Sequence, residues 1–342
     1  MIYVGMDVSG KSFEIYAVNA KGKKIFKGPV EASRQGIKDL AKELGQEKKV
    51  FIFEAGNQMK WIAETVAKID EIAHVVHPNE VKWIVQSNGK TDRVDAKKLA
   101  ELGRIDGLPR PVVVAEGKER RLRELISARD NLMNKRVAFI NSIKGYVRQE
   151  GRRIPKGFFN GAEWTVLLDT MKISSTLKDI MASVMNAVEA LKKSEDELTE
   201  KIKAVDDKKI ELIKTVPAIG DFSARVLFSA LITAKRFENK KKVANYGALT
   251  PTIYQSGGVT NLGHINRDGR GEIRRVLLQC AHTVARMKSA ESRPLREFFE
   301  RIEKKRGKKV AVIALARKLL TTVYGVWKSG EVYDPRKLLS HA

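Results

Sequence analysis

Two long helical patterns occupy the middle of the chain and constrain its fold more than any other feature. Apolar residues recur at helical spacing from about residue 117 to 148, and again from about residue 173 to 214. In the second pattern a strict seven-residue interval comprises Leu177, Val184, Leu191, Leu198 and Val205. Such an interval is typical of helices that pack along a single seam. We therefore expect long, coiled-coil-like helices over residues 116–210, forming a stalk between two domains.

The partner of the second helix is left open by the sequence. The helix either forms a coiled coil with another copy of the chain or packs antiparallel on the 117–148 helix of its own chain. Ser194 weakens the seam, and packing within one chain produces similar patterns. The first alternative would make the stalk the element through which the protein oligomerises.

Strand-like and helical patterns alternate in the residues before the stalk. Residues 2–8 and 13–18 are rich in β-branched and aromatic residues, which predicts a hairpin that opens a sheet. A helical pattern from about residue 36 to 44 precedes the strand-like run 50–55. This alternation predicts an α/β domain with a mixed sheet over residues 1–115.

The chain changes character after the stalk. Apolar helical segments alternate with a glycine-rich loop at 256–271, which predicts a mostly α-helical domain over residues 211–342. The segment from Leu212 to Arg225 looks like a helix-hairpin-helix, whose glycine-containing turn offers backbone N–H groups to a phosphate. The alternative is a plain connection between two helices.

A surplus of positive charge points to a polyanionic partner. Sixty-five Lys and Arg oppose forty-one Asp and Glu, which gives a net charge of +24 and a pI near 9.9. Solubility requires far less charge than this. A membrane-surface protein would place its basic residues opposite an apolar helix face, whereas here they are spread over most of the chain. Nucleic acid is therefore the favoured partner, and no membrane association is expected.

The densest basic tract lies in the first helical pattern. Residues 117–156 contain twelve Lys or Arg and four Asp or Glu, a local net charge of +8. Guanidinium groups suit phosphate oxygens, although each arginine has the alternative of a solvated helix face. The candidate nucleic-acid-binding residues of this tract are Arg120, Arg121, Arg136, Arg148, Arg152 and Arg153. Those around the glycine-rich loop and the helix after it are Arg267, Arg270, Arg274 and Arg275.

The single cysteine and the apolar runs bear on the cellular compartment. Cys280 has no second cysteine with which to form a disulfide or a zinc site, which fits a reducing cytosol. The first residues lack the basic and apolar regions of a signal peptide, and the apolar stretch 310–327 is interrupted by Arg317 and Lys318. We expect a cytoplasmic protein that is neither exported nor membrane-spanning.

Four acidic residues of the first domain form a candidate catalytic site. Asp7 and Glu54 each end a predicted strand, where a half-buried carboxylate needs a charged partner. Asp92 and Asp95 stand three residues apart at the start of a predicted helix, which places both on one face. For this pair the alternative is structural, with Asp92 as an N-cap and Asp95 as a partner of the helix dipole.

Carboxylates that share a site need a cation between them. Like charges a few ångströms apart repel strongly, and one or two Mg²⁺ ions, which prefer hard oxygen ligands, would neutralise them. Two such ions would clamp the attacking and leaving oxygens of an in-line displacement at a phosphodiester. The four acids therefore predict a Mg²⁺ site for phosphoryl transfer on nucleic acid.

The order and spacing of these acids resemble the DEDD pattern of RuvC-like nucleases, which have a ribonuclease H fold. In the second half of the chain, a close succession of runs resembles the C-terminal domain of the DEDD transposases of bacterial insertion sequences, the IS110 family. These runs are YGALTP at 246–251, QSGG at 255–258, LGHI at 262–265 and RGEIRRVLL at 270–278. The resemblance extends over nearly the whole chain.

This resemblance implies a Mg²⁺-dependent recombinase whose serine attacks DNA and forms a covalent phosphoserine link before strand exchange. Ser256, which precedes Gly257 and Gly258, matches that serine. A serine in a glycine-rich loop is accessible to a backbone phosphate, but its hydroxyl needs a base or a metal for activation. Without the resemblance, Ser256 would be an ordinary turn residue.

The same resemblance implies the partners. Many proteins of this kind use a structured non-coding RNA, encoded beside the gene, to specify donor and target DNA. We therefore expect donor DNA, target DNA and a guide RNA as partners, and a dimer that assembles into a tetramer across two DNA duplexes. Base pairing would carry the sequence information, so that no base-reading helix is required.

Two other functions remain open from the sequence. A hydrolytic junction nuclease would use the four acids alone, with water as the nucleophile and Ser256 only shaping a turn. A non-catalytic architectural protein would grip branched DNA or RNA through its charge, with the acids serving as caps and ion pairs. The first predicts that loss of Ser256 is mild, and the second predicts metal-independent binding without cleavage.

Overall fold

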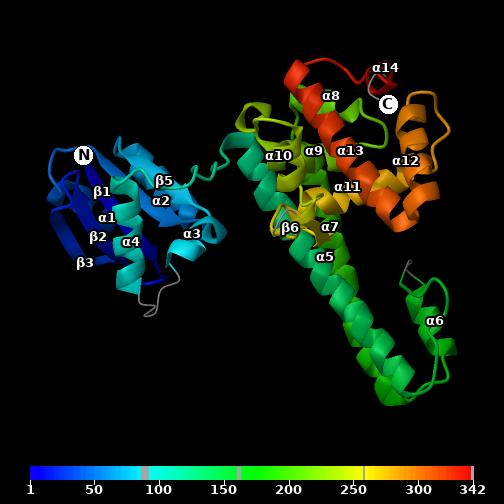
Figure 1. Cartoon of the computed structure of the whole chain (residues 1–342). Helices are drawn as coiled ribbons and strands as arrows, with labels where there is room; N and C mark the ends of the chain where they lie inside the picture. Colours follow the sequence, from blue (N-terminus) through cyan, green and yellow to red (C-terminus); the bar gives the residue numbers. More distant parts are fainter. Residues whose placement is uncertain (86–91, 160–162, 257–258, 340–342) are drawn as a thin grey trace. The chain divides into compact units, whose positions relative to one another are not determined.

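The computed structural model describes residues 1–85, 92–159, 163–256 and 259–339 (Figure 1). The chain forms two compact units, Met1–Val114 and Ala115–Ala342. The first is a mixed α/β unit with a five-stranded sheet and the second is mostly helical, which confirms the predicted fold class at this level. The division of the chain into three functional segments stays a prediction.

A mixed sheet is the centre of the first unit. Its strand order is β3-β2-β1-β4-β5, in which β1, β2 and β3 are antiparallel neighbours and β4 and β5 run parallel to β1. The strands are β1 (Ile2–Val8), β2 (Ser12–Asn19), β3 (Lys24–Glu31), β4 (Lys49–Glu54) and β5 (Ile72–Val76). The hairpin predicted for the start of the chain is therefore present, and β3 extends it.

Helices cover both faces of this sheet. The helices of the first unit are α1 (Arg34–Glu43), α2 (Met59–Lys68), α3 (Pro78–Val85) and α4 (Asp92–Arg104). Ile37 of α1 and Ile62 of α2 are buried with Phe51 on one face. Leu99 of α4 is buried with Ile52 on the other face. Because β4 is covered on both sides, its sequence is a continuous apolar run rather than an alternating one.

The stalk is a pair of antiparallel helices from one chain, α5 (Gly117–Gln149) and α7 (Ser175–Lys203) (Figure 1). Arg136 of α5 binds Glu195 of α7, whereas Ile143, nearer the end of α5, packs with Met181, nearer the start of α7. A short helix, α6 (Trp164–Thr170), packs on the same apolar cluster. The seam of α7 is therefore used within the chain, as the second of the two alternatives predicts.

The second helical pattern is interrupted where the sequence predicts continuity. One helix is predicted over residues 173–214, but α7 ends at Lys203 and a separate helix, α8 (Lys208–Lys214), follows. The Asp207 side chain accepts a hydrogen bond from the backbone N of Lys209 (3.0 Å) and so caps α8. A short acidic side chain that binds the backbone in this way favours a helix start over a continuous helix.

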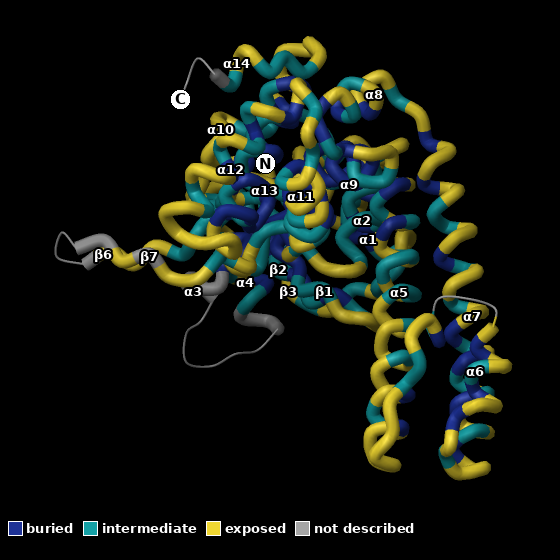
Figure 2. Tube along the Cα trace, turned by 90° about the vertical axis from the view of Figure 1, so that its right-hand side faces the viewer, coloured by how far each residue is buried: buried dark blue, intermediate teal, exposed yellow. Residues whose placement is uncertain are grey.

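The remaining elements build a helical core around α9 and α13. They are α9 (Asp221–Leu231), the 3₁₀ helix η1 (Ala234–Arg236), α10 (Lys240–Tyr246), β6 (Pro251–Ser256), β7 (Val259–Ile265), α11 (Gly271–Val284), α12 (Arg293–Arg306), α13 (Lys308–Ser329) and α14 (Arg336–Leu339). Figure 2 shows buried residues along α9 and α13 and mostly exposed residues along the stalk. Leu122 and Ile202 of the stalk are buried in the same core, which anchors the stalk to it.

A strand lies within the segment predicted as a glycine-rich loop. Residues Val259–Ile265 form β7, which pairs antiparallel with β6. The prediction of a loop over 256–271 is therefore wrong for these residues. The β-branched residues Val259, Thr260 and Ile265 favour a paired strand, and the glycines around them obscured that preference.

Among the described helices, α13 meets the length and composition of a membrane span. However, 56% of its most apolar stretch is buried inside the protein. Leu315, Leu319 and Val323 belong to the core that α13 shares with α9 and α11. Its apolar character is therefore explained by packing within the second unit.

Candidate active site and nucleic-acid interface

Asp7 and Glu54 end neighbouring parallel strands of the first unit. The parallel register between β1 and β4 runs to the residues just before them, so Asp7 and Glu54 stand side by side. Side chains alternate between the two faces along a strand. Asp7 therefore shares a face with Gly5, and Glu54 shares one with Ile52, which is the face that α4 covers.

α4 packs on this face at very short range. A Cβ atom on Gly5 would lie 2.0 Å from the carbonyl oxygen of Ala96, so only glycine permits this approach. A Cβ atom on Gly103 would lie 3.2 Å from the ring of Tyr3. Because the earlier residue of α4 faces the later residue of β1, the helix runs antiparallel to the strand. Its first turn therefore lies toward the strand ends that carry the two carboxylates.

Asp92 and Asp95 belong to this first turn. Asp92 is the first residue of α4, and its side chain lies outside the described residues. Asp95 is half-buried, and its Oδ1 atom is buried without a hydrogen-bond partner in the described part of the chain. A buried carboxylate oxygen of this kind needs a ligand, and a hard divalent cation is a suitable one.

The ends of β1 and β4 and the start of α4 thus lie at one edge of the sheet. The described side chains at this edge do not form a complete metal site. Asp7 is half-buried and Glu54 is exposed. No three His, Cys, Asp or Glu side chains of the described residues are grouped so that they could hold a metal ion, and the side chain of Asp92 is not among those described. The donor set is made of carboxylate oxygens alone, which fits Mg²⁺ rather than a softer metal.

Ser256 belongs to the second unit, at the end of an exposed β-hairpin. It is the last residue of β6 and pairs with Val259 of β7. Its side chain and residues 257–258 lie outside the described part of the chain. Ile253 and Tyr254 of the same strand are 63% and 67% exposed, so the hairpin offers apolar and aromatic side chains to solvent.

The segment predicted as a helix-hairpin-helix forms two helices, α8 and α9, joined by residues 215–220. Ala218 in this turn has a φ of 63°, in the left-handed region. The backbone N of Ile219 donates to Val216 O at 3.1 Å. A phosphate-binding role for this turn stays a prediction.

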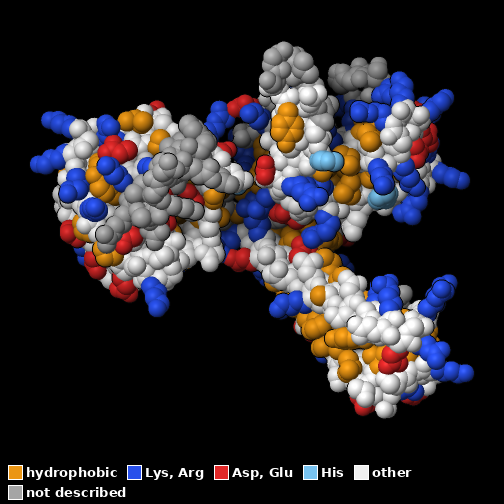
Figure 3. Space-filling model, turned by 60° about the horizontal axis from the view of Figure 1, so that its bottom comes forward, with side chains coloured by type: hydrophobic (Ala, Val, Ile, Leu, Met, Phe, Trp, Pro, Cys, Tyr) orange, Lys and Arg blue, Asp and Glu red, His pale blue; other side chains and the backbone are white. Residues whose placement is uncertain are grey.

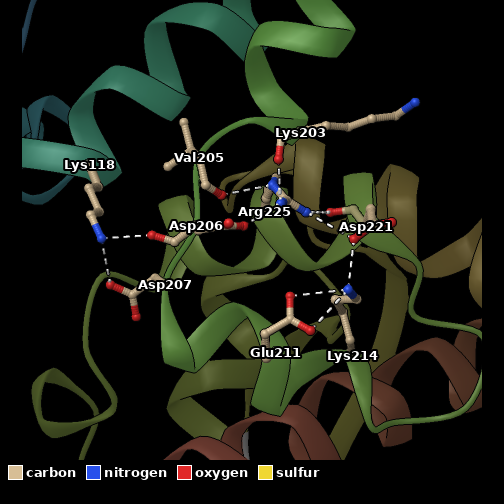
Figure 4. Close-up of polar contacts among 9 residues, drawn as sticks. All are labelled: Lys118, Lys203, Val205, Asp206, Asp207, Glu211, Lys214, Asp221 and Arg225. Atoms are coloured by element: carbon tan, nitrogen blue, oxygen red, sulfur yellow. Dashed lines mark hydrogen bonds and ion pairs between the residues drawn. The ribbon is translucent and has the colours of Figure 1, made fainter.

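Arg225 of α9 connects this turn to the end of the stalk (Figure 4). Its side chain is only 4% exposed. It donates hydrogen bonds to the carbonyl oxygens of Lys203 and Val205, and to the carboxylates of Asp206 and Asp221. The buried guanidinium is thus fully supplied with acceptors, as a buried charge requires. It fixes the start of α9 against the end of α7.

Asp221 also accepts a hydrogen bond from Lys214, and the two charged atoms are 2.9 Å apart (Figure 4). The hydrogen bonds from Lys214 and Arg225 hold the pKa of Asp221 below its ordinary value, and the bond to Asp221 raises the pKa of Lys214. Lys214 also binds Glu211. The cations nearest the turn are therefore engaged by protein carboxylates.

Several of the predicted nucleic-acid-binding arginines are bound within the protein. Arg136 donates to both carboxylate oxygens of Glu195, at 2.6 and 3.1 Å, and joins α5 to α7. Arg275 binds Asp130 and joins α11 to α5. Arg120 pairs with Glu124, Arg270 pairs with Glu272, and Arg274 donates to Asn266 O. The predicted arginines with exposed side chains are Arg121, Arg148, Arg152, Arg153 and Arg267.

Basic side chains are spread over the face drawn in Figure 3 rather than gathered in one patch. Arg123, from the basic tract of α5, and Arg236, which no sequence pattern marks, lie with Arg270 around Tyr246. They come from α5, η1 and the start of α11. No local motif links them, so only the tertiary structure brings this set together.

Comparison with protein families connects both units to one class of enzyme. Residues 4–150 match the model of the DEDD transposases of the IS110 type, described as a transposase. Residues 210–296 match the model described as "Transposase IS116/IS110/IS902 family". The chain belongs to the IS110 family of transposases. The four acidic residues of this transposase lie in the first matched region, and Ser256 lies in the second.

Curated relatives of this IS110-family transposase match it over most of its length. The transposase for insertion sequence element IS1111A of Coxiella burnetii is 22% identical over 338 residues, 96% of this chain and 90% of the relative. The transposase for IS1328 of Yersinia enterocolitica is 22% identical over 280 residues, 80% and 82% of the two chains. The pilin gene-inverting protein of Moraxella bovis is 32% identical over 127 residues, 36% and 38% of the two chains.

Proposed function

We propose that this insertion-sequence transposase breaks and rejoins DNA in a Mg²⁺-dependent reaction that passes through a covalent link between Ser256 and DNA. The main support is the arrangement of the first unit. Asp7 and Glu54 stand side by side at the ends of β1 and β4, and α4 brings Asp92 and Asp95 toward the same edge. The strand order β3-β2-β1-β4-β5 supports a RuvC-like, ribonuclease H-type fold for residues 1–115.

The four carboxylates are proposed to hold the metal. They supply only hard oxygen donors, and the unpartnered Oδ1 of Asp95 is available to a cation. Bound Mg²⁺ would neutralise charge on the phosphate and lower the pKa of the attacking hydroxyl. The residues themselves contribute rigid placement, since β1, β4 and α4 belong to one packed unit.

Ser256 is proposed as the nucleophile. Its Oγ forms a bond to the phosphorus while the bond from phosphorus to one bridging deoxyribose oxygen breaks. The serine proton leaves to a base or solvent, and the departing oxygen takes up a proton. The phosphoserine link conserves the energy of the broken phosphodiester, so attack by a strand-end hydroxyl reverses the step and rejoins DNA. The exposed hairpin allows a bulky duplex to reach this position.

The remaining features of the proposal concern partners. A structured guide RNA would pair with donor and target DNA, and the net charge of +24 is enough for two kinds of nucleic acid. The α8–α9 turn is proposed to contact phosphates as a helix-hairpin-helix. We also propose a dimer that forms a tetramer across two duplexes, working in the cytoplasm.

A covalent-adduct assay tests the reaction. The protein is co-expressed with its flanking DNA, Mg²⁺ is added, and DNA retained after denaturation is compared for wild type, Ser256→Ala and Asp7→Asn. Matched controls are Ser127→Ala and Asp39→Asn, which change exposed residues of α5 and α1. We expect the adduct in wild type and both controls, and its loss in the two site variants. RNA that co-purifies in the same samples is sequenced to identify the guide.

Other outcomes would assign another function. Metal-dependent nicking that survives Ser256→Ala would identify a hydrolytic nuclease. Tight binding by the wild type without nicking or adduct in Mg²⁺ would identify an architectural protein. Thermal unfolding of each variant separates loss of chemistry from loss of fold.

A further inference from the structure

Three arginines from distant parts of the second unit converge on Tyr246. The guanidinium carbon of Arg236 lies 4.6 Å from the centre of the Tyr246 ring. The backbone N of Arg270 donates to Tyr246 O at 2.8 Å. Arg123 and the Tyr246 hydroxyl donate to the same oxygen, that of Ala230, at 3.1 and 3.0 Å. We call Arg123, Arg236 and Arg270 the arginine cluster.

Each member of the arginine cluster is held in place by more than one contact. Arg123 also donates to Ser229 O at 2.8 Å. Arg236 also stacks on Phe237, with 4.9 Å between the guanidinium carbon and the ring centre. Side chains fixed in this way lose little further entropy when they bind a ligand. The cluster is therefore preorganised rather than a set of free surface arginines.

The charges within the cluster are not balanced. Within the described part of the chain, the groups that act on the charge of Arg123 include one carboxylate, Glu272, which is already paired with Arg270. Burial first, and then the nearby Arg270 and Arg236, lower the pKa of Arg123. The Nε atom of Arg270 lies 2.9 Å from Glu272 Oε1. Three guanidinium groups thus lie near one carboxylate, Glu272, and an anion would balance the remaining positive charge.

The cluster is connected to the base of the hairpin that carries Ser256. Asn266, which follows β7, donates to Thr250 O at 2.8 Å, and Thr250 donates to Asn245 of α10 at 3.0 Å. A Cβ on Gly269 would lie 2.6 Å from Tyr246 O, so the segment between β7 and α11 is pressed against the end of α10. The hairpin base and the arginine cluster therefore form one packed piece.

We propose that the arginine cluster binds a backbone phosphate of duplex DNA and so positions that duplex against the β6–β7 hairpin. This inference rests on the proposed serine reaction for its purpose, although phosphate binding itself does not require that reaction. DNA is favoured over RNA because the cluster is packed against the hairpin on which the proposed nucleophile lies. The three arginines act as positioning residues, since they fix the substrate and need not touch the reacting atoms.

Binding measurements without catalysis test the site. The full-length protein carries Ser256→Ala, and Mg²⁺ is replaced by EDTA, so that DNA is bound but not cut. The dissociation constant for a duplex of the native element end is measured over a series of salt concentrations. Arg236→Gln and Arg270→Gln are compared with Arg301→Gln, which removes an exposed arginine that also stacks on a ring, 5.7 Å from the centre of Phe298.

We expect each cluster variant to weaken DNA binding roughly tenfold and to reduce the slope of log Kd against log salt by about one. Arg301→Gln should change neither quantity, and Arg236→Lys should keep most of the slope because it keeps the charge. Unchanged affinity and slope in both cluster variants, with normal thermal unfolding, would overturn the inference. So would weakened binding of a structured RNA with unchanged binding of the duplex.

The proposed function is tested separately on the same proteins with Ser256 restored. One outcome is that the wild type forms no adduct while the cluster variants still bind DNA more weakly and with a smaller slope of log Kd against log salt. That result would support the phosphate site and contradict the serine mechanism. If the wild type forms the adduct and the cluster variants bind DNA normally, the mechanism stands and the phosphate site does not.

Discussion

Gly5 of β1 and Ala96 of α4 are so close that a Cβ atom on residue 5 would lie 2.0 Å from the Ala96 carbonyl oxygen. It would also lie 2.7 Å from the backbone N of Ala100. Backbone atoms cannot move aside by a change of rotamer, as a side chain can. The position of α4, and with it that of Asp92 and Asp95 relative to the strand ends, therefore depends on this glycine.

Gly5→Ala should displace α4 and abolish metal-dependent cleavage while most molecules stay folded. We expect the free energy of unfolding to fall by about 1–3 kcal/mol, as for an overpacked core. Gly10→Ala is the control, because a Cβ there meets no atom within 4 Å and should change neither quantity. DNA cleavage in Mg²⁺ and chemical denaturation are measured together. Full cleavage by Gly5→Ala would contradict the placement of the α4 carboxylates in the active site.

The parts of the fold that could be predicted from sequence are those encoded locally. β1 and β4 are apolar runs, and an acid at the end of such a run is visible without a structure, as at Asp7 and Glu54. The close approach of α4 to β1 depends on Gly5 and involves residues that are distant in sequence. Strand ends were thus predictable, whereas the contact that brings Asp95 toward them was not.

Competing signals limit what the sequence predicts at two places. The apolar spacing continues through Val205 and Ile210, so it masks the helix start that Asp207 creates. Arginine-rich segments suggest DNA contacts, but whether a guanidinium is free depends on partners elsewhere in the chain. Arg136 finds such a partner in Glu195, on a helix that follows much later.

The Arg136–Glu195 pair should contribute to the stability of the stalk. Glu195 is 5% exposed and Arg136 is 25% exposed, so removal of the arginine leaves a buried carboxylate without its partner. Arg136→Met is expected to lower the free energy of unfolding by about 2–4 kcal/mol, and Arg136→Met with Glu195→Met should recover most of this loss. Chemical denaturation of both single variants and the double variant gives the coupling energy. A loss in the double variant equal to the sum of the two single losses would show that the pair contributes little.

Gly145→Ala should stabilise the stalk. Gly145 lies inside α5, and a Cβ there would meet no atom within 4 Å of the same chain. Alanine restricts the unfolded chain and favours the helix, which is worth about 0.5–1 kcal/mol. Thermal unfolding of the free protein measures the gain. A loss of stability instead would indicate that this position of α5 is covered by a second copy of the chain.

The Asp221 carboxylate should make the junction of α7, α8 and α9 sensitive to acid. Hydrogen bonds from Lys214, and then from Arg225, hold its pKa below the ordinary value of an aspartate. Because the pKa is lower in the folded protein than in the unfolded chain, the contribution to stability is complete above the unfolded pKa. It is lost as the pH falls through the lowered folded value. Asp221→Asn should therefore be less stable than wild type at neutral pH.

The difference between the two proteins should shrink as the pH is lowered from about 5 through the range in which carboxylates take up protons. It should be small, because the Asp221 side chain is 53% exposed and water screens its ion pairs. Urea unfolding of both proteins at a series of pH values measures it, with Asp39→Asn as a control at an exposed carboxylate of α1. A difference that stays constant with pH would mean that the charge of Asp221 does not account for the lower stability of Asp221→Asn.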